Sequence, residues 1–482
     1  MVLLGVWAPI HAGDNSLGLK VPPGFEVSEY SDSSLANDIF SMALDPQGRV
    51  VVSGRGYIRL LVDDHKSGKA TRAIDLADGP KEGAQGLLWE GSWLYFTADG
   101  GLQRYRINSA GDKVEGPAEL IRAMKTGGEH CAHAIRRGPD GWLYVLCGNS
   151  TGINKSYAQL PTSPIQNPVA GCVLRFSPDL KTSEIVADGF RNPYDMDFNP
   201  NGELFTFDSD NERCVSLPWY ESTRFYQVIP GGHYGWLAPQ RAETWRLPPY
   251  FFDVVAPIAY LGRGSPTGVS CYRHVQFPEE YQGGMFLCDW TFGKVYFLSL
   301  KKTETTYTFR KKVFLESVGD NGFAPTAIAV HPKTGDLFIS IGGRGTRGAV
   351  YRLRYPQRSG SIDASALAKF QVKQRYVDWK EKMAEPREYR PDAKNDIPGI
   401  CKLISSDPTA PEMRLIGVRI IQLALGELVH PKQKGTVWEG YTFRQEPQSS
   451  GDIIPALASA FPSGHADLDR EISRTLAALE DE

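Results

Sequence analysis

The chain has 482 residues, 23% of them charged and 41% hydrophobic, which is typical of a globular protein and long enough for more than one domain. A formal net charge of −3 gives no basis for binding nucleic acid or an anionic membrane. The seven cysteines form neither a CxxC pair nor the CxxCH motif that attaches haem c. Most of them are therefore expected to be buried strand residues.

Residues 1–21 are expected to be the remnant of a signal and a lead-in to the first domain. The apolar run 2–10 is too short to cross a membrane. It fits the end of a secretory signal cut after Ala12, although a basic start is missing and Ile10 is larger than such cleavage sites prefer. Residues 17–30 predict a strand that enters the first blade of the repeat described next.

A recurring unit organises residues 22–356. Each copy has an apolar strand, a polar turn with glycine, and a second strand rich in β-branched and aromatic residues. The turn glycines are Gly48, Gly91, Gly141, Gly202, Gly283 and Gly335. Their spacing is that of propeller blades, about 40 to 50 residues, stretched by insertions near 150–170 and 213–265. Because one blade cannot bury its own faces, the repeat predicts an all-β, six-bladed β-propeller.

The composition changes after Arg354. In residues 357–482 the strand repeat stops, and apolar residues recur near a 3.6-residue period in 412–428 and 468–479, with a further helical pattern in 364–383. Pairs of short helices resemble HEAT-like repeats. Only about two pairs fit, whereas such solenoids need about three or more repeats. We therefore expect a smaller all-α tail and a chain that is a fragment of a longer protein.

The stretch 127–149, GGEHCAHAIRRGPDGWLYVLCGN, joins scaffold to chemistry. Its second half predicts a tight turn at 138–141 and a strand. Its first half places His130 beside Glu129, where a strand would point into the centre of the ring. A neutral imidazole there suits proton transfer; a turn histidine bonded to backbone is the alternative. His133, farther along, is expected to be structural.

Three more phrases follow in order: DGFRNP at 188–193, GGHYGW at 231–236 and SPTG at 265–268. Together with HAIRRGPDGWLY at 133–144, this set resembles the soluble quinoprotein glucose dehydrogenases and the related aldose and sorbosone dehydrogenases. The resemblance covers about residues 22–355. It implies a six-bladed propeller that carries pyrroloquinoline quinone (PQQ) and calcium and oxidises a sugar or a related small alcohol.

The helical tail resembles the region that follows such propellers in large exported bacterial proteins ending in a cytochrome c. This likeness implies a periplasmic or secreted protein with a cytochrome c as electron acceptor. No membrane span is expected.

The resemblance also implies roles for individual residues. His130 would be the general base, and Arg191 would stabilise the negative charge that develops on the quinone. Asn192 would hydrogen-bond the cofactor. Arg344 and Arg347 would reach its carboxylates, and Lys294 is the nearest candidate for the family's cofactor-binding lysine.

Two positions depart from the family's pattern. Asn149 stands where the family has an aspartate that orients the base, and an amide cannot stabilise an imidazolium electrostatically. The loop 208–212 replaces the family's Gly-Pro calcium loop and is richer in hard oxygen ligands, which predicts a calcium site at Asp208, Asp210 and Glu212.

Structural alternatives accompany these assignments. Arg191 would then tie two blades together through Asp195 or Asp197, the loop 208–212 would be a solvated acidic loop, and His233 would pack in a turn.

Three functions follow: a PQQ- and calcium-dependent dehydrogenase, a calcium-dependent lactone hydrolase, and a non-catalytic propeller that binds a glycan or protein. In the hydrolase the ligands would be Glu129, Asn149, Asn192 and Asp208. Asn149 favours the non-catalytic propeller, whereas His130, Arg191 and Asn192 favour the dehydrogenase.

Overall fold

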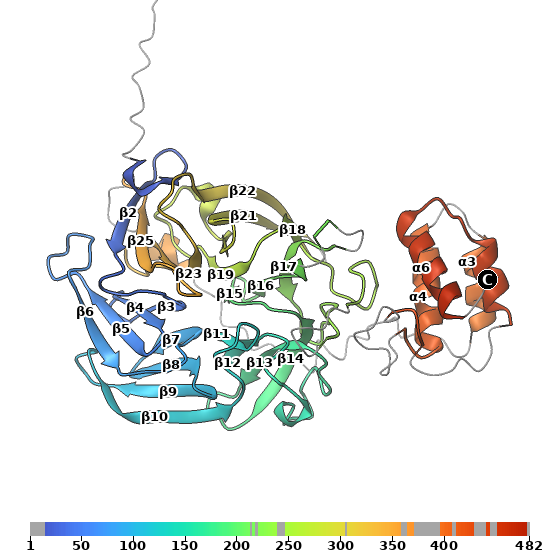
Figure 1. Ribbon diagram of the computed structural model, residues 1–482, viewed down its shortest axis with the longest axis horizontal. Helices are drawn as coiled ribbons and strands as arrows, with labels where there is room; N and C mark the ends of the chain where they lie inside the picture. The colour runs from blue at the N-terminus through green and yellow to red at the C-terminus, as the bar shows by residue number, and fades with distance from the viewer. Residues whose placement is uncertain are drawn as a thin grey trace, which may run out of the picture.

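The computed structural model describes residues 15–212, 215–216, 220–238, 246–303, 306–357, 364–370, 396–406, 411–428, 440–443 and 451–479. Six antiparallel sheets surround a common axis, as Figure 1 shows, so the predicted six-bladed β-propeller is confirmed.

The blades follow one another along the chain. Blades one to three are β3 (Ser41–Leu44), β4 (Val50–Gly54), β5 (Tyr57–Val62) and β6 (Arg72–Ala77); β7 (Gly86–Glu90), β8 (Trp93–Ala98), β9 (Gly101–Ile107) and β10 (Val114–Ala123); and β11 (Ala132–Arg137), β12 (Leu143–Cys147), β13 (Gly171–Phe176) and β14 (Ser183–Phe190). Blades four to six are β15 (Met196–Phe198), β16 (Leu204–Asp208), β17 (Thr223–Val228) and β18 (Ala259–Gly262); β19 (Pro266–Cys271), β20 (Met285–Asp289), β21 (Lys294–Lys302) and β22 (Tyr307–Ser317); and β23 (Pro325–Val330), β24 (Leu337–Ile341) and β25 (Ala349–Arg354).

The second strands are buried on both faces, as β4 and β16 are at every residue, because neighbouring blades cover them on each side. In β4, Val50 and Val52 pack into the cluster that contains Phe338 of blade six. Val51, between them, packs into the cluster that contains Leu87 of blade two. Alternate side chains of one strand thus build two different blade interfaces, which explains why isolated blades are not stable.

Each predicted turn glycine lies between the first and second strands of its blade, and all six have positive φ. Space also excludes a side chain at some of them. At Gly335, an added Cβ would lie 2.1 Å from Nδ1 of His274. Glycine is therefore required there both by backbone conformation and by packing.

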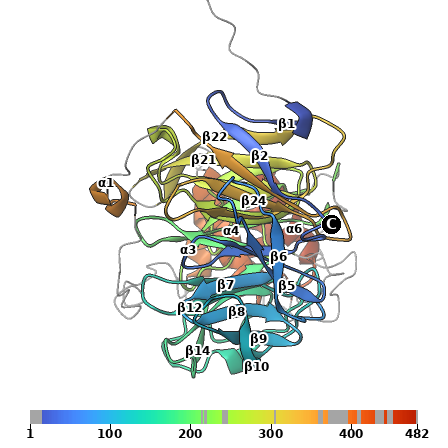
Figure 2. The same ribbon diagram turned by 90° about the vertical axis from the view of Figure 1, so that its left-hand side faces the viewer.

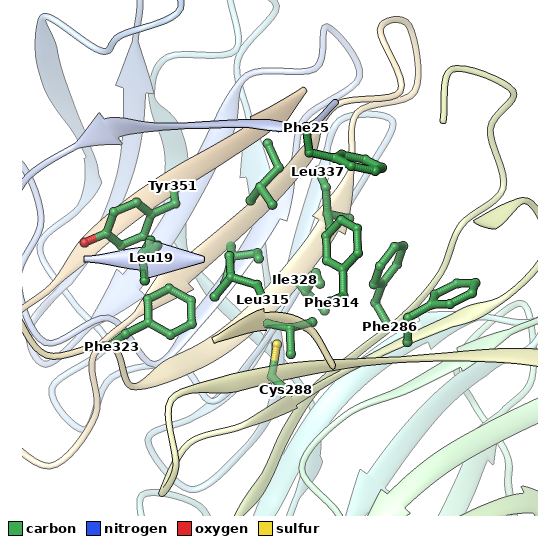
Figure 3. Packing of buried hydrophobic residues seen from close by; sticks show 14 of the residues in the cluster. Leu19, Phe25, Phe286, Cys288, Phe314, Leu315, Phe323, Ile328, Leu337 and Tyr351 are labelled. Carbon is green, nitrogen blue, oxygen red and sulfur yellow. The ribbon is translucent and has the colours of Figure 1, made fainter. Parts of the chain in front are cut away.

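The N-terminal strands do not enter blade one, so that expectation was wrong. β1 (Leu19–Lys20) pairs with β22 at the edge of blade five, beside which it lies in Figure 2. β2 (Glu26–Ser31) pairs with β25, Glu26 opposite Arg354, and completes blade six. Phe25 packs edge to face on Phe314 at a centroid distance of 5.0 Å, inside the apolar cluster between blades five and six (Figure 3). These interactions close the ring between distant parts of the chain.

The tail is helical in its described parts: α1 (Ala364–Ala368), α3 (Ile397–Ser406), α4 (Pro411–Ala424), α5 (Ile453–Ser459) and α6 (Ala466–Ala478). The last four pack around one core that includes Ile404, Val418, Leu457 and Ile472, and we call them the helical unit. Its α4 and α6 match the two periodic stretches of the sequence. The pattern at 364–383 extends beyond the described residues, and the HEAT-like character of the tail stays a prediction. Figure 1 places this unit beside the ring.

Candidate functional site

A pocket of about 740 Å³ lies where the chain enters the first strands of the blades. Each of β3, β7, β11, β15, β19 and β23 contributes residues from its start or from the loop that precedes it. The lining residues are Asp38, Phe40, Arg55, Gln85, Gly127, Glu129, Asn192, Tyr194, Ser265, Pro266, Thr267, Trp290, Thr326, Gly343, Arg344 and Gly345. The pocket therefore depends on closure of the whole ring, and its volume is that of a small-molecule site.

Two amide oxygens in this pocket lack hydrogen-bond partners. Oδ1 of Asn192 and Oε1 of Gln85 are both buried, and neither accepts a hydrogen bond within the described residues. Buried polar atoms are normally satisfied, so unpaired acceptors on a pocket wall indicate a ligand with donors. Hydroxyl groups of a sugar are such donors.

Cationic and aromatic groups lie on the same wall. Arg344 forms an ion pair with Glu129, and its guanidinium lies 5.1 Å from the centroid of the Trp290 ring. The Trp290 ring is fixed by its Nε1, which donates to the carbonyl of Gly342 at 2.7 Å. Arg55 is exposed and reaches the pocket from the β4–β5 turn. The site thus offers guanidinium groups for carboxylates and a flat aromatic face.

His130 and Asn149 meet at the open end of the β11–β12 hairpin. Gly148 N donates to Cys131 O at 2.9 Å, and Ser150 N donates to His130 O at 2.9 Å, so the two flanking segments lie side by side. Nδ1 of His130 lies 2.6 Å from Oδ1 of Asn149. Gly148 lets these groups approach Asn192, since an added Cβ would lie 2.9 Å from Oδ1 of that residue.

A second contact of Asn149 fixes the tautomer of His130. Nδ2 of Asn149 donates to the carbonyl of Ala238 at 3.0 Å, so its Oδ1 is the atom that faces the imidazole. Nδ1 of His130 must then donate, which makes Nε2 the unprotonated nitrogen of the neutral ring. His130 is only 4% exposed and is absent from the pocket lining.

Arg191 directly precedes the pocket residue Asn192 in the sequence and does not itself line the pocket. Its backbone N and that of Asn192 donate to the carboxylate of Asp208, at 2.9 and 2.7 Å, which fixes the loop that precedes β15. Its guanidinium donates to Oγ of Ser209 at 2.8 Å and to Glu212, and lies 5.5 Å from the centroid of the Trp236 ring. Arg191 is therefore buried beside the pocket.

Arg191 does not tie blades together through Asp195 or Asp197. Those carboxylates pair instead with Arg136 and Arg273.

The acidic residues of the loop 208–212 all have partners within the protein. Asp208 binds backbone amides, and burial raises its pKa. Asp210 pairs with Arg224 and Arg246 at 2.6 and 2.9 Å, and Glu212 pairs with Arg191. Across the described part of the chain, no group of three His, Cys, Asp or Glu side chains is placed to hold a metal ion. Arginines pair with Asp210 and Glu212, and backbone amides bind Asp208. Calcium would have to displace these partners, so the calcium site stays a prediction.

We therefore expect calcium, compared with a chelator, to leave the thermal unfolding midpoint unchanged. Asp210→Asn should lower the unfolding free energy by about 3–5 kcal/mol with or without calcium, because it breaks a buried ion pair with Arg224. Calorimetry of both proteins measures this. A calcium-dependent rise of the midpoint that disappears in Asp210→Asn would restore the calcium site.

The other residues singled out by the sequence lie apart from the pocket. Arg347 donates to Glu29 and to the hydroxyl of Tyr351, and it does not line the pocket. Lys294 begins β21 and does not line it either.

The two other histidines of the quoted motifs are packed. His133 bonds the carbonyl of Pro193 through Nδ1 at 2.9 Å, and burial lowers its pKa to about 4, so the ring is neutral. His233 packs on Gly189, where an added Cβ would lie 2.7 Å from its ring. Both positions agree with the structural alternatives.

Sequence reasoning missed several pocket residues, among them Gln85, Tyr194 and Trp290. A positional signal was present. Gln85 lies just before β7, and Asn192 and Glu129 lie in the loops that precede β15 and β11. Comparing the loops before the first strands would have included Gln85.

Comparisons with known proteins agree with this architecture. A family model described as "Domain of unknown function (DUF7133)" matches residues 14–340. Quinoprotein glucose dehydrogenase B of Acinetobacter calcoaceticus is 26% identical over 162 residues, which are 28% of this chain and 31% of that protein. The chain thus matches under a third of that relative's length. This homology confirms the resemblance to quinoprotein sugar dehydrogenases.

Two solved structures share the fold. An oxidoreductase (glucose dehydrogenase) from Thermus thermophilus is 20% identical with a TM-score of 0.50, covering 68% of this chain and 99% of that one. The holo PQQ domain of pyranose dehydrogenase from Coprinopsis cinerea is 12% identical with a TM-score of 0.51, covering 70% and 97%. Among the helices that the structure describes, none combines the length and apolarity needed to cross a membrane.

Proposed function

This chain belongs to the DUF7133 family, whose model spans more than half of it, and we propose that its propeller oxidises a sugar or related small alcohol with PQQ. The observation that carries the proposal is the hydrogen bond between His130 and Asn149 beside a ring-centred pocket, because it leaves Nε2 of His130 as a base. The homology to a protein named a quinoprotein glucose dehydrogenase supports the same reaction class.

The pocket residues fit PQQ and a sugar together. Arg344 and Arg55 supply guanidinium groups for the carboxylates of the cofactor, and Trp290 supplies a flat apolar face. The unpaired oxygens of Asn192 and Gln85 accept hydroxyl groups of the sugar. When bound, PQQ supplies the acceptor for the two electrons that leave the sugar carbon.

The residues of the chain handle the proton and the charge. Nε2 of His130 accepts the proton of the reacting hydroxyl, while Asn149 holds the ring through Nδ1. An aldose thereby becomes a lactone, and a secondary alcohol becomes a ketone. Arg191 places a fixed positive charge beside the reacting groups. Asn149 is neutral and does not stabilise the imidazolium electrostatically, so the rate is lower than a carboxylate at this position would give.

Access to His130 requires a movement. The imidazole is buried, and Asn149 is held by the carbonyl of Ala238 in the connection between β17 and β18. The proposal requires that this connection withdraw when substrate enters, as loops over active sites commonly do. Periplasmic or secreted localisation and a cytochrome c acceptor are part of the same proposal.

Reconstitution tests the function. Adding PQQ should give saturable binding, measured by the cofactor's absorbance, and dye reduction that needs both PQQ and an aldose or polyol. No calcium requirement is expected, since backbone amides bind Asp208 and arginines pair with Asp210 and Glu212. Absence of PQQ binding would refute the proposed dehydrogenase function. Calorimetric binding of a glycan without oxidation would establish the non-catalytic propeller, which the burial of His130 favours.

A further inference from the structure

Between β17 and β18 the structure describes residues 229–238 and 246–258, which cover the buried side of the site, and we call these two segments the covering loop. It adds to blade three, because Tyr234 N donates to Asp188 O at 2.9 Å and Trp236 N donates to Gly189 O at 2.8 Å. The Trp236 side chain, 2% exposed, lies against the guanidinium of Arg191. Two residues later the Ala238 carbonyl holds Asn149. Residues 236–238 thus contact Arg191 through Trp236, and through Ala238 they contact Asn149, the partner of His130.

Residues 246–258, the returning half of the covering loop, form backbone hydrogen bonds with residues 233–235. Leu247 N donates to Gly235 O at 2.6 Å, and Val255 N donates to His233 O at 2.8 Å. Leu247 also packs in an apolar cluster with Phe251. A displacement of residues 246–258 would therefore also displace Gly235, which precedes Trp236.

That returning half binds the helical unit. The guanidinium of Arg419, on α4, donates to both carboxylate oxygens of Asp253, at 3.1 and 2.7 Å. The same guanidinium lies 4.2 Å from the centroid of the Phe251 ring. Nearby, the hydroxyl of Tyr250 donates to Glu471 of α6 at 2.7 Å.

The charged groups at this contact are paired, and two of them, Arg419 and Glu471, are buried, whereas Asp253 is 30% exposed. The Arg419 side chain is 1% exposed, and it also donates to both oxygens of Glu427, at 2.7 and 2.8 Å. The Glu471 side chain is fully buried, and Nε2 of Gln422 donates to it at 2.9 Å. Removing one partner of such a network leaves an uncompensated charge, which disfavours separation of the two surfaces.

We propose that Arg419 is a positioning residue for the site: by holding Asp253, the helical unit keeps the covering loop closed over Arg191 and Asn149. A residue outside the propeller thus sets how often the buried side of the pocket opens. The inference concerns opening of the loop and does not rest on the proposed dehydrogenase activity.

Hydrogen–deuterium exchange of the full chain tests the proposal. Asp253→Asn removes the charge but leaves Arg419 paired with Glu427, so the helical unit stays folded. Exchange at the amides of Tyr234 and Trp236 should rise by roughly ten- to a hundredfold, the factor that corresponds to losing a hydrogen bond to a charged group. Asp253→Glu, which keeps the charge, should restore slow exchange. Arg419→Met should act like Asp253→Asn.

A second readout reports the site itself. The Arg191 side chain is 7% exposed, so phenylglyoxal should modify it slowly in the wild type and at least severalfold faster in Asp253→Asn. Asp452→Asn is the matched control: Asp452 precedes α5 in the same helical unit and makes no capping bond, so it should change neither readout.

Unchanged exchange at Tyr234 and Trp236 and unchanged Arg191 modification in Asp253→Asn would overturn the proposal. So would exchange that rises only within α3 to α6, because the contact would then stabilise the helical unit alone. Failure of PQQ binding, by contrast, would remove the dehydrogenase function and leave this result standing.

Discussion

Replacing His130 by alanine is expected to lower PQQ-dependent sugar oxidation by about 10²–10⁴, the usual contribution of a positioned general base. The bond to Asn149 makes Nε2 of His130 the unprotonated nitrogen of the neutral ring, so the proposal gives it the proton of the reacting hydroxyl. The affinity for PQQ should stay near its wild-type value, because the imidazole is absent from the pocket lining. Initial rates of dye reduction at saturating PQQ, with absorbance titration for affinity, measure both effects.

Added imidazole should recover part of the His130→Ala rate, since the substitution leaves a cavity of that shape. His65→Ala is the control, because His65 is exposed and distant from the pocket lining. If the His130→Ala protein oxidises sugar at the wild-type rate, His130 has only a structural role in the β11–β12 hairpin and is not the general base.

Replacing Arg191 by methionine is expected to lower the same rate by about 10²–10³, the loss seen when a fixed group that stabilises transition-state charge is removed. PQQ affinity should fall as well, because Arg191 shares its loop with Asn192 on the pocket wall. The variant keeps the backbone bonds to Asp208, so the loop retains its course. Rate and affinity measured in one preparation separate this result from misfolding.

Glu212→Gln is the matched control for Arg191. The Glu212 side chain is 50% exposed, so its ion pair with Arg191 contributes about 0–1 kcal/mol and its loss should change the rate only slightly. If Glu212→Gln lowers the rate as much as Arg191→Met does, the ion pair only holds the loop 208–212 in place and Arg191 has no part in the reaction.

The six blades were predictable because their signal is local and repeated. A turn glycine followed by an apolar strand recurs six times, and burial of both strand faces, as at Val50 and Val51, leaves no polar alternation to confuse the pattern. The partner of β2 was not predictable from such a signal. Nothing near Glu26 indicates Arg354, and only closure of the ring selects that pairing.

The sequence predicted which of the proposed site residues lie together but not how exposed they are. The resemblance located His130, Asn149, Arg191 and Asn192, and the structure brings the four together. Their cover comes from a backbone carbonyl, that of Ala238, and a carbonyl carries no sequence signature.

The partners of the acidic loop 208–212 were unpredictable for a similar reason. Arg224 and Arg246, which neutralise Asp210, lie in β17 and in the covering loop, so neighbouring residues gave no sign of them.

The pairing of β2 with β25 also fixes the order of events during synthesis. β2 leaves the ribosome before the strands of blades one to five, yet its partner is the last strand of the ring. At about 5–20 residues per second, β2 waits on the order of tens of seconds with its hydrogen-bonding edge unpaired. The walls of the pocket shared by blades one and six form only at the end of that interval. The helical unit follows in the sequence, so the pocket of the nascent chain forms before Arg419 can bind Asp253 of the covering loop.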